Sequence, residues 1–114
     1  MHELALMTTV LDAVRESARQ MNIARVNRLK LVVGKLTMAL PDSLQFAFEV
    51  LSQDDLFRGA VLEIEEKDMQ CECAHCQHLF KVENGYRFVC PRCGENGAVI
   101  VAGRELYIDY YEGE

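Results

Sequence analysis

This 114-residue sequence has no long hydrophobic run. A membrane-spanning helix needs about 20 consecutive apolar residues, and no window approaching that length occurs here. The first residues include an acid, Glu3, where a secretory signal would carry positive charge. We therefore expect no membrane partner and a protein that stays in the cytoplasm, with its cysteines as reduced thiols.

The sequence also lacks a basic patch or tail. Lys and Arg number 12 against 18 Asp and Glu, which gives a net charge of −6. Residues 1–60 are electrically balanced, so the whole acidic excess lies in residues 61–114. Proteins that bind nucleic acid gather positive charge on one face. Nucleic acid is therefore excluded as the main partner, and a polybasic membrane anchor is disfavoured for the same reason.

The residue patterns typical of enzymes are missing. We find no glycine-rich phosphate loop, no Ser/His/Asp arrangement and no cluster of acids with histidine. Half of the residues are apolar and 26% are charged, which is typical of a folded globular protein. The length allows one ordinary domain, or a small domain with a smaller appendage. We expect a small folded protein that is not an enzyme.

Two periodicities predict the main elements. Leu4, Met7, Leu11, Val14, Ala18 and Met21 form the apolar stripe of a first helix, so Met7 and Met21 are expected in the core. A second helix follows Pro41, with Asp42 and Gln45 spaced as a capping box and an end near residues 54–55. Alternating apolar residues predict strands within 25–36, 61–65 and 106–110. The fold class is therefore α+β, with two helices and three strands.

The pattern changes between Met69 and Asn96, where cysteines and turn residues replace apolar periodicity. We interpret residues 69–98 as an insertion into a domain made of residues 1–68 plus 99–114. Within the insertion, residues 80–89 predict a hairpin around Asn84-Gly85. Because only two chain crossings join the insertion to the domain, we expect some hinge freedom between them.

Two CxxC elements, Cys73–Cys76 and Cys90–Cys93, are separated by 13 residues. Each CxxC turn can direct two thiolates at one ion, and four thiolates in a tetrahedron favour Zn²⁺. So small a segment cannot bury enough apolar surface to fold alone, and zinc would supply folding free energy. The sequence predicts a structural zinc ribbon. Since four protein ligands leave no open position, this zinc should not activate water.

Other interpretations of the cysteine segment remain. A dithiol redox site would use a CxxC, although such a motif usually occurs once and beside a strand–helix unit. Cys71 lies two residues before Cys73, so a CxC register is conceivable, but we interpret Cys71 as a spare thiol. His75 and His78 are expected to be exposed loop residues or auxiliary metal contacts.

The amino terminus offers a second set of metal ligands. A histidine at position 2 brings together the terminal amine of Met1, a backbone amide and the imidazole of His2. Such a nitrogen-rich, planar-capable set suits Ni²⁺ or Cu²⁺. Glu3 adds a nearby carboxylate. The alternative is that His2 is simply a solvated terminal residue.

Taken together, these motifs resemble the HypA family of nickel metallochaperones of hydrogenase maturation. The resemblance covers the whole chain in order, and its most specific parts are the Met-His-Glu start and the paired CxxC elements. Further matching segments are Val33-Gly34-Lys35-Leu36 and Leu44-Gln45-Phe46-Ala47-Phe48. The resemblance leaves the role of Cys71 open.

The resemblance implies a function and partners. Ni²⁺ would bind His2, with the amine of Met1 and support from Glu3, while zinc would bind Cys73, Cys76, Cys90 and Cys93. The partners would be the GTPase HypB and the large subunit of [NiFe]-hydrogenase, with urease as a further target for some members. The edge strands would also permit a homodimer. The alternative function is a non-catalytic zinc-ribbon module for protein interactions.

Overall fold

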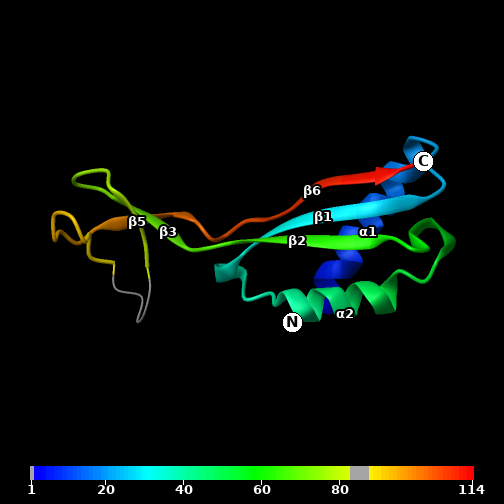
Figure 1. The fold of residues 1–114 in the computed structure, drawn as a ribbon, viewed down its shortest axis with the longest axis horizontal. Coiled ribbons are helices and arrows are strands. Elements are labelled where there is room, and N and C mark those ends of the chain that lie inside the picture. The colour runs from blue at the N-terminus through cyan, green and yellow to red at the C-terminus, as the bar shows by residue number, and fades with distance from the viewer. Residues whose placement is uncertain (1, 83–87) are drawn as a thin grey trace.

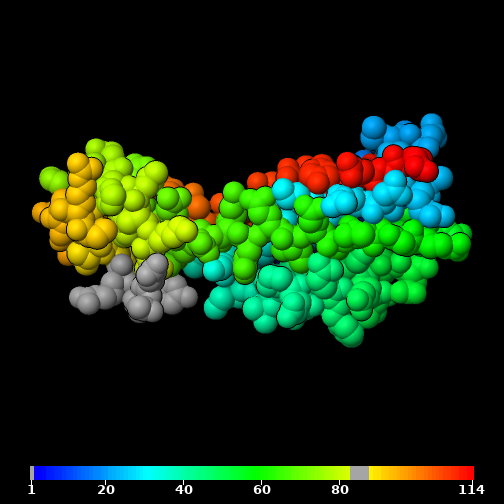
Figure 2. Space-filling model, viewed as in Figure 1, coloured from blue at the N-terminus to red at the C-terminus, as the bar shows by residue number. Residues whose placement is uncertain are grey.

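The structure is a computed structural model that describes residues 2–82 and 88–114. It is elongated, 55 × 25 × 17 Å, and a narrow waist joins its two parts (Figures 1 and 2). Each part contains a three-stranded sheet, and both helices lie in the larger part. The predicted α+β class is confirmed. The elements are α1 (Glu3–Gln20), β1 (Val26–Gly34), a 3-10 helix (Lys35–Thr37), α2 (Pro41–Leu51), a second 3-10 helix (Asp55–Phe57), β2 (Val61–Lys67), β3 (Gln70–Cys73), β4 (Leu79–Lys81), β5 (Ala98–Ala102) and β6 (Leu106–Gly113).

The sheet of the larger part has the order β2-β1-β6. β1 is parallel to β2 and antiparallel to β6. A parallel pair requires a crossover connection, and the segment containing α2 provides it. Leu29 and Leu31 of β1 are fully buried beneath the helices, while Arg28 and Lys30 face solvent on the other side of the sheet. The predicted alternation is confirmed from Arg28 to Leu31, whereas Val32, expected beside Arg28 and Lys30, is buried.

α1 buries the middle of its predicted stripe but not the ends. Met7, Leu11 and Val14 are buried in the core, whereas Leu4 and Met21 are 52% and 66% exposed. The prediction that Met21 belongs to the core was therefore wrong, because α1 ends at Gln20 and the chain then turns away. No helix in the described part of the chain is both long and apolar enough to cross a membrane.

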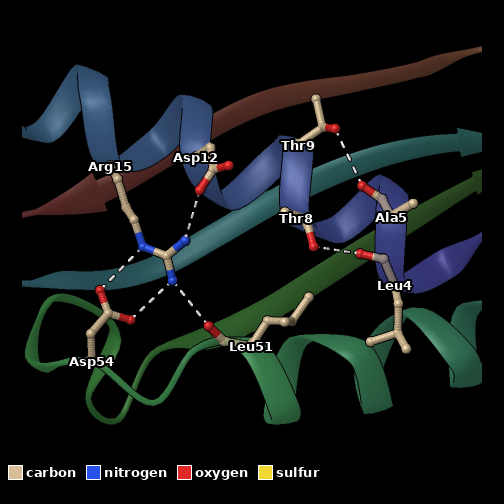
Figure 3. Close-up of polar contacts among 8 residues, drawn as sticks. All are labelled: Leu4, Ala5, Thr8, Thr9, Asp12, Arg15, Leu51 and Asp54. Carbon is tan, nitrogen blue, oxygen red and sulfur yellow. Dashed lines mark hydrogen bonds and ion pairs between the residues drawn. The ribbon is translucent and has the colours of Figure 1, made fainter.

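Arg15 connects the two helices (Figure 3). Its guanidinium donates to the carboxylates of Asp12 and Asp54 and to the carbonyl of Leu51, at 3.0–3.2 Å. The same group lies 5.3 Å from the ring centroid of Phe57, within cation–π range. One side chain of α1 therefore holds the end of α2 and the segment after it.

The predicted capping box of α2 was wrong. Leu40 is the N-cap residue, Pro41 occupies the first turn, and no side chain caps the helix. Gln45 instead donates to the carbonyl of Leu62 in β2 at 2.8 Å. α2 also ends at Leu51, earlier than the expected end near residues 54–55, and the second 3-10 helix follows.

The smaller part has the sheet order β4-β3-β5. β3 is antiparallel to both neighbours. The predicted hairpin of residues 80–89 is not the basis of this sheet: β4 pairs with β3, and residues 88–89 are not in a strand. Its Asn84-Gly85 turn lies outside the described residues. Cys71 is fully buried with Phe80 and Ile100, so it is a core residue of this part.

The waist is where four chain segments meet. Gly34 donates its backbone N–H to Glu105 at 2.6 Å, and Leu36 donates to Gly103 at 2.8 Å. Across the waist, Asp68 pairs with Lys35 at 2.6 Å and with Lys81 of β4 at 3.2 Å. The division of the chain into a domain of residues 1–68 plus 99–114 and an insertion of residues 69–98 stays a prediction. So does the hinge freedom between them. The pairing with β3 places the whole of β5 in the smaller sheet.

Candidate metal centres

The four cysteines of the CxxC elements meet at the end of the smaller part. Their sulfur atoms all lie within 4.8 Å of one another. Cys73 and Cys93 are 3.6 Å apart, and Cys76 and Cys90 are 3.7 Å apart. A zinc–sulfur bond of about 2.3 Å implies about 3.8 Å between the sulfurs of a tetrahedron. The cluster is therefore consistent with zinc.

The two CxxC turns have the same construction. The backbone N–H groups of His75 and Cys76 donate to the sulfur of Cys73 at 3.4 Å. In the second turn, Arg92 donates to the sulfur of Cys90 at 3.4 Å. Each turn then closes with a residue of positive φ, Gln77 at 63° and Gly94 at 77°, whose N–H bonds back to the carbonyl of the turn's first cysteine. The N–H groups that donate to Cys73 and Cys90 direct partial positive charge at the first sulfur of each pair.

Hydrogen bonds and burial act in opposite directions on the pKa values of these thiols. At Cys90, burial opposes ionisation, but the N–H donors of Cys93 and Arg92 outweigh it and lower the pKa to about 6. At Cys93, a donor from Glu95 is outweighed by burial and by the neighbouring sulfurs, and the pKa rises to about 12. The pKa values of these neighbouring thiols thus move in opposite directions, and a bound cation with a charge of 2+ would favour the thiolate form of all four.

The other polar residues of this part have different surroundings. His75 is exposed, and the ring of His78 stacks on Phe80 with 6.3 Å between centroids. Among the described residues, neither histidine belongs to the cysteine group. Burial raises the pKa of the Cys71 thiol, which keeps it protonated.

The amino terminus lies in the larger part, away from the cysteines (Figure 1). Met1 lies outside the described residues. His2 is exposed and precedes α1 as its N-cap residue. Its carbonyl accepts the N–H of Leu6 at 2.9 Å. The imidazole is therefore presented at the open end of a helix.

The carboxylate of Glu3 already has a partner that the sequence did not indicate. It accepts the backbone N–H of Leu40, the N-cap residue of α2, at 3.2 Å. This hydrogen bond lowers the pKa of Glu3. The two residues are 37 positions apart, so no local pattern could predict the contact. Glu3 fixes the start of α1 against the start of α2.

A surface groove of about 550 Å³ begins at His2. Leu6 and Val10 of α1 line one side, and Leu106 and Ile108 of β6 line the other. No local sequence pattern indicated this groove, because its walls come from opposite ends of the chain. It places an apolar surface directly beside the candidate nickel residues.

Comparisons with known proteins give one consistent result. A family model described as hydrogenase/urease nickel incorporation, metallochaperone, HypA matches residues 1–113. The hydrogenase maturation factor HypA of Moorella thermoacetica is 42% identical over 114 residues, covering 100% of both chains. That of Lawsonia intracellularis is 36% identical over 118 residues, again covering 100% of both. The solution structure of the nickel metallochaperone HypA from Helicobacter pylori covers 99% of this chain and 97% of its own, with TM-score 0.66 and 23% identity, a likeness of fold.

Proposed function

The chain belongs to the hydrogenase/urease nickel-incorporation metallochaperone family, HypA, and we propose that it binds its nickel at the first residues of the chain. As a member of this family it is a nickel metallochaperone of hydrogenase maturation and not an enzyme. Nickel is its cargo, so it needs a site that both holds and releases the ion.

The exposed His2 at the head of α1 carries the proposal. The first N–H groups of a helix have no acceptor within the helix. The backbone amide of His2 is therefore not needed for the fold, and it can deprotonate and bind a metal without breaking α1. Together with the imidazole of His2 and the amine of Met1 it supplies nitrogen ligands in adjacent chelate rings, which suit Ni²⁺.

Glu3 supports this site by holding it in position and does not serve as a primary ligand of the nickel. Its carboxylate is engaged by the Leu40 N–H, which holds the beginning of α1 in place. His2, directly ahead of Glu3, is exposed to solvent. An open site of this kind can pass its ion to a partner's thiolates, which are softer ligands.

The cysteine cluster has a different role. Cys73, Cys76, Cys90 and Cys93 would hold zinc as a closed four-thiolate site. Bound there, zinc would balance the negative charge of the thiolates and would help to hold together a sheet whose core is small. The proposed partners are the GTPase HypB and the large subunit of [NiFe]-hydrogenase, with urease as a second recipient.

Nickel calorimetry on the zinc-loaded protein tests the site. The parent is compared with His2→Ala and with a variant carrying one residue before Met1, which displaces the terminal amine. His75→Ala is the matched control, because it removes an exposed histidine far from the terminus. Both terminal variants should lose tight binding and the control should keep it. Equal affinity in parent and His2→Ala would reject the proposal.

A further inference from the structure

The smaller sheet has an outer strand without any charge. β5 pairs with β3 on one side, and within residues 2–82 and 88–114 no strand pairs with its other side. Every other strand in this part of the chain contains a charged residue, whereas β5 consists of alanine, valine and isoleucine alone. Charged side chains are a common protection of a free strand edge. β5, drawn in orange in Figure 1, therefore offers an edge that lacks this protection.

The two faces of β5 have different surroundings. Ile100 packs against the core of the smaller part. On the opposite face, Val99 and Val101 are 57% and 49% exposed. Val99 lies opposite Glu72 of β3, which in turn lies opposite the exposed Leu79 of β4. The outer face of the sheet therefore carries a row of side chains that ends, with an apolar residue, at the free edge of β5.

A register irregularity divides β5 into two stretches. Between Ile100 and Ala102, β5 has one residue more than β3, so Val101 has no partner on β3. Such a bulge bends a strand and can re-aim a side chain. Val101 lines, together with Arg104, a surface hollow of about 270 Å³. The regular edge of the strand is therefore Ala98–Ile100, and the hollow follows it.

Arg104 brings a positive charge to this hollow. The residue is exposed, and its guanidinium forms no hydrogen bond or ion pair with the described part of the chain. Glu105 also lines the hollow, but its carboxylate is directed at the backbone N–H of Gly103, from which it accepts at 2.8 Å. A carboxylate brought into the hollow by another molecule would therefore find Arg104 ready to pair.

We propose that β5 is a docking strand for an extended, acidic segment of a partner protein. The segment adds to Ala98–Ile100 as an antiparallel strand, which is the arrangement of the other pairs in this sheet. Its acidic residue precedes the paired residues, so that the carboxylate lies beside Arg104. Its apolar side chains continue the row that ends at Val99. In such strand addition, backbone hydrogen bonds provide affinity and the side chains provide selectivity.

Amide NMR spectra of the full zinc-loaded chain, titrated with a synthetic peptide, test the proposal. The probe is the peptide Glu-Val-Thr-Val-Thr with both ends blocked, and its control has glutamine in place of glutamate. The amide resonances of β5 should shift on binding, and those of β2 should not. Because an exposed ion pair is worth roughly two- to fivefold in affinity, the glutamine peptide should bind that much more weakly.

Three variants separate the contribution of the charge from that of the edge. Arg104→Glu should reverse the preference, so that a peptide with lysine in place of glutamate binds more tightly than the original. Val99→Asp replaces an apolar contact on the docking strand by a charge, and should weaken the binding of the glutamate and glutamine peptides. Val61→Asp is the matched control, because this valine of β2 is similarly exposed, and it should bind both peptides as the parent does.

Several results would overturn the proposal. One is the absence of shifts in β5 at millimolar peptide, and another is shifts confined to other strands. Equal binding by Val99→Asp and the parent, or an unchanged preference in Arg104→Glu, would also reject it. Amide protection of β5 that grows with the concentration of the protein alone would identify a second copy as the occupant, and would overturn it as well.

Discussion

The glycine at the waist provides a sharp test of how the two parts are joined. A Cβ on Gly34 would lie well inside contact distance of the carbonyl of Gly103, and 2.7 Å from the backbone nitrogen of Arg104. Because both neighbours are backbone atoms, neither can rotate away. Gly34→Ala must therefore separate the two segments and weaken the hydrogen bond from Gly34 to Glu105.

The cost can be worked out from these contacts. Overpacking costs about 1–3 kcal/mol, and a lost hydrogen bond adds about 1 kcal/mol. For a chain of this length, about 3 kcal/mol corresponds to a fall in Tm of roughly 12 °C. Thermal unfolding of the zinc-loaded protein, followed by circular dichroism, measures this directly.

Gly59→Ala is the matched control. Gly59 has φ of +77°, and a Cβ there would meet nothing within 4 Å. This variant should lose only about 1 kcal/mol, from backbone strain alone. If Gly34→Ala melted within a degree or two of the parent, the contact between Gly34 and Gly103 would not join the two parts.

Three further predictions follow from other contacts. Removing zinc with a chelator, or replacing Cys90 by Ser, should unfold β3–β5 and leave the helical circular dichroism of α1 and α2 largely intact. Hydrogen exchange would show which strands lose protection, and unfolding of the whole chain would contradict this prediction. Arg15 lowers the pKa of Asp54, so this exposed pair contributes stability, at most about 1 kcal/mol, above the unfolded pKa, and this stability is lost as the pH falls through the lower folded pKa. Arg15→Met should therefore melt earlier than the parent at pH 7. The difference should narrow in acid without vanishing, because the contacts of Arg15 with Leu51 and Phe57 do not titrate. The Leu40 amide resonance should shift as Glu3 is protonated, at a pH below 4.5 because this bond lowers the pKa of Glu3, and Glu3→Gln should abolish that titration in NMR spectra.

The sequence patterns predicted the features that depend on residues close together in the chain. The stripe of α1 and the alternation of β1 follow from which side chains must leave water, and both are confirmed in the middle of each element. The CxxC spacing predicted a cluster of four thiols, because each turn brings its own pair together. The prediction of Met21 as core was wrong at the end of the helix, where the chain direction decides burial.

Contacts between distant segments could not be predicted in this way. Asp42 and Gln45 have the spacing of a capping box, yet Gln45 finds a better acceptor in Leu62 of β2. The pairing of β4 with β3 was not part of the expected hairpin at residues 80–89, whose Asn84-Gly85 turn lies outside the described residues. The partner of Glu3 and the groove beside His2 likewise depend on tertiary structure.

The central claim is that nickel binds nitrogen at the amino terminus while the cysteine sulfurs keep their zinc. A titration of the zinc-loaded protein with Ni²⁺, followed by ultraviolet–visible absorption with released zinc measured in parallel, tests it most directly. The account predicts one equivalent of nickel with only weak visible bands, none in His2→Ala, and no zinc release. A strong thiolate-to-nickel charge-transfer band, with zinc appearing in solution, would contradict it.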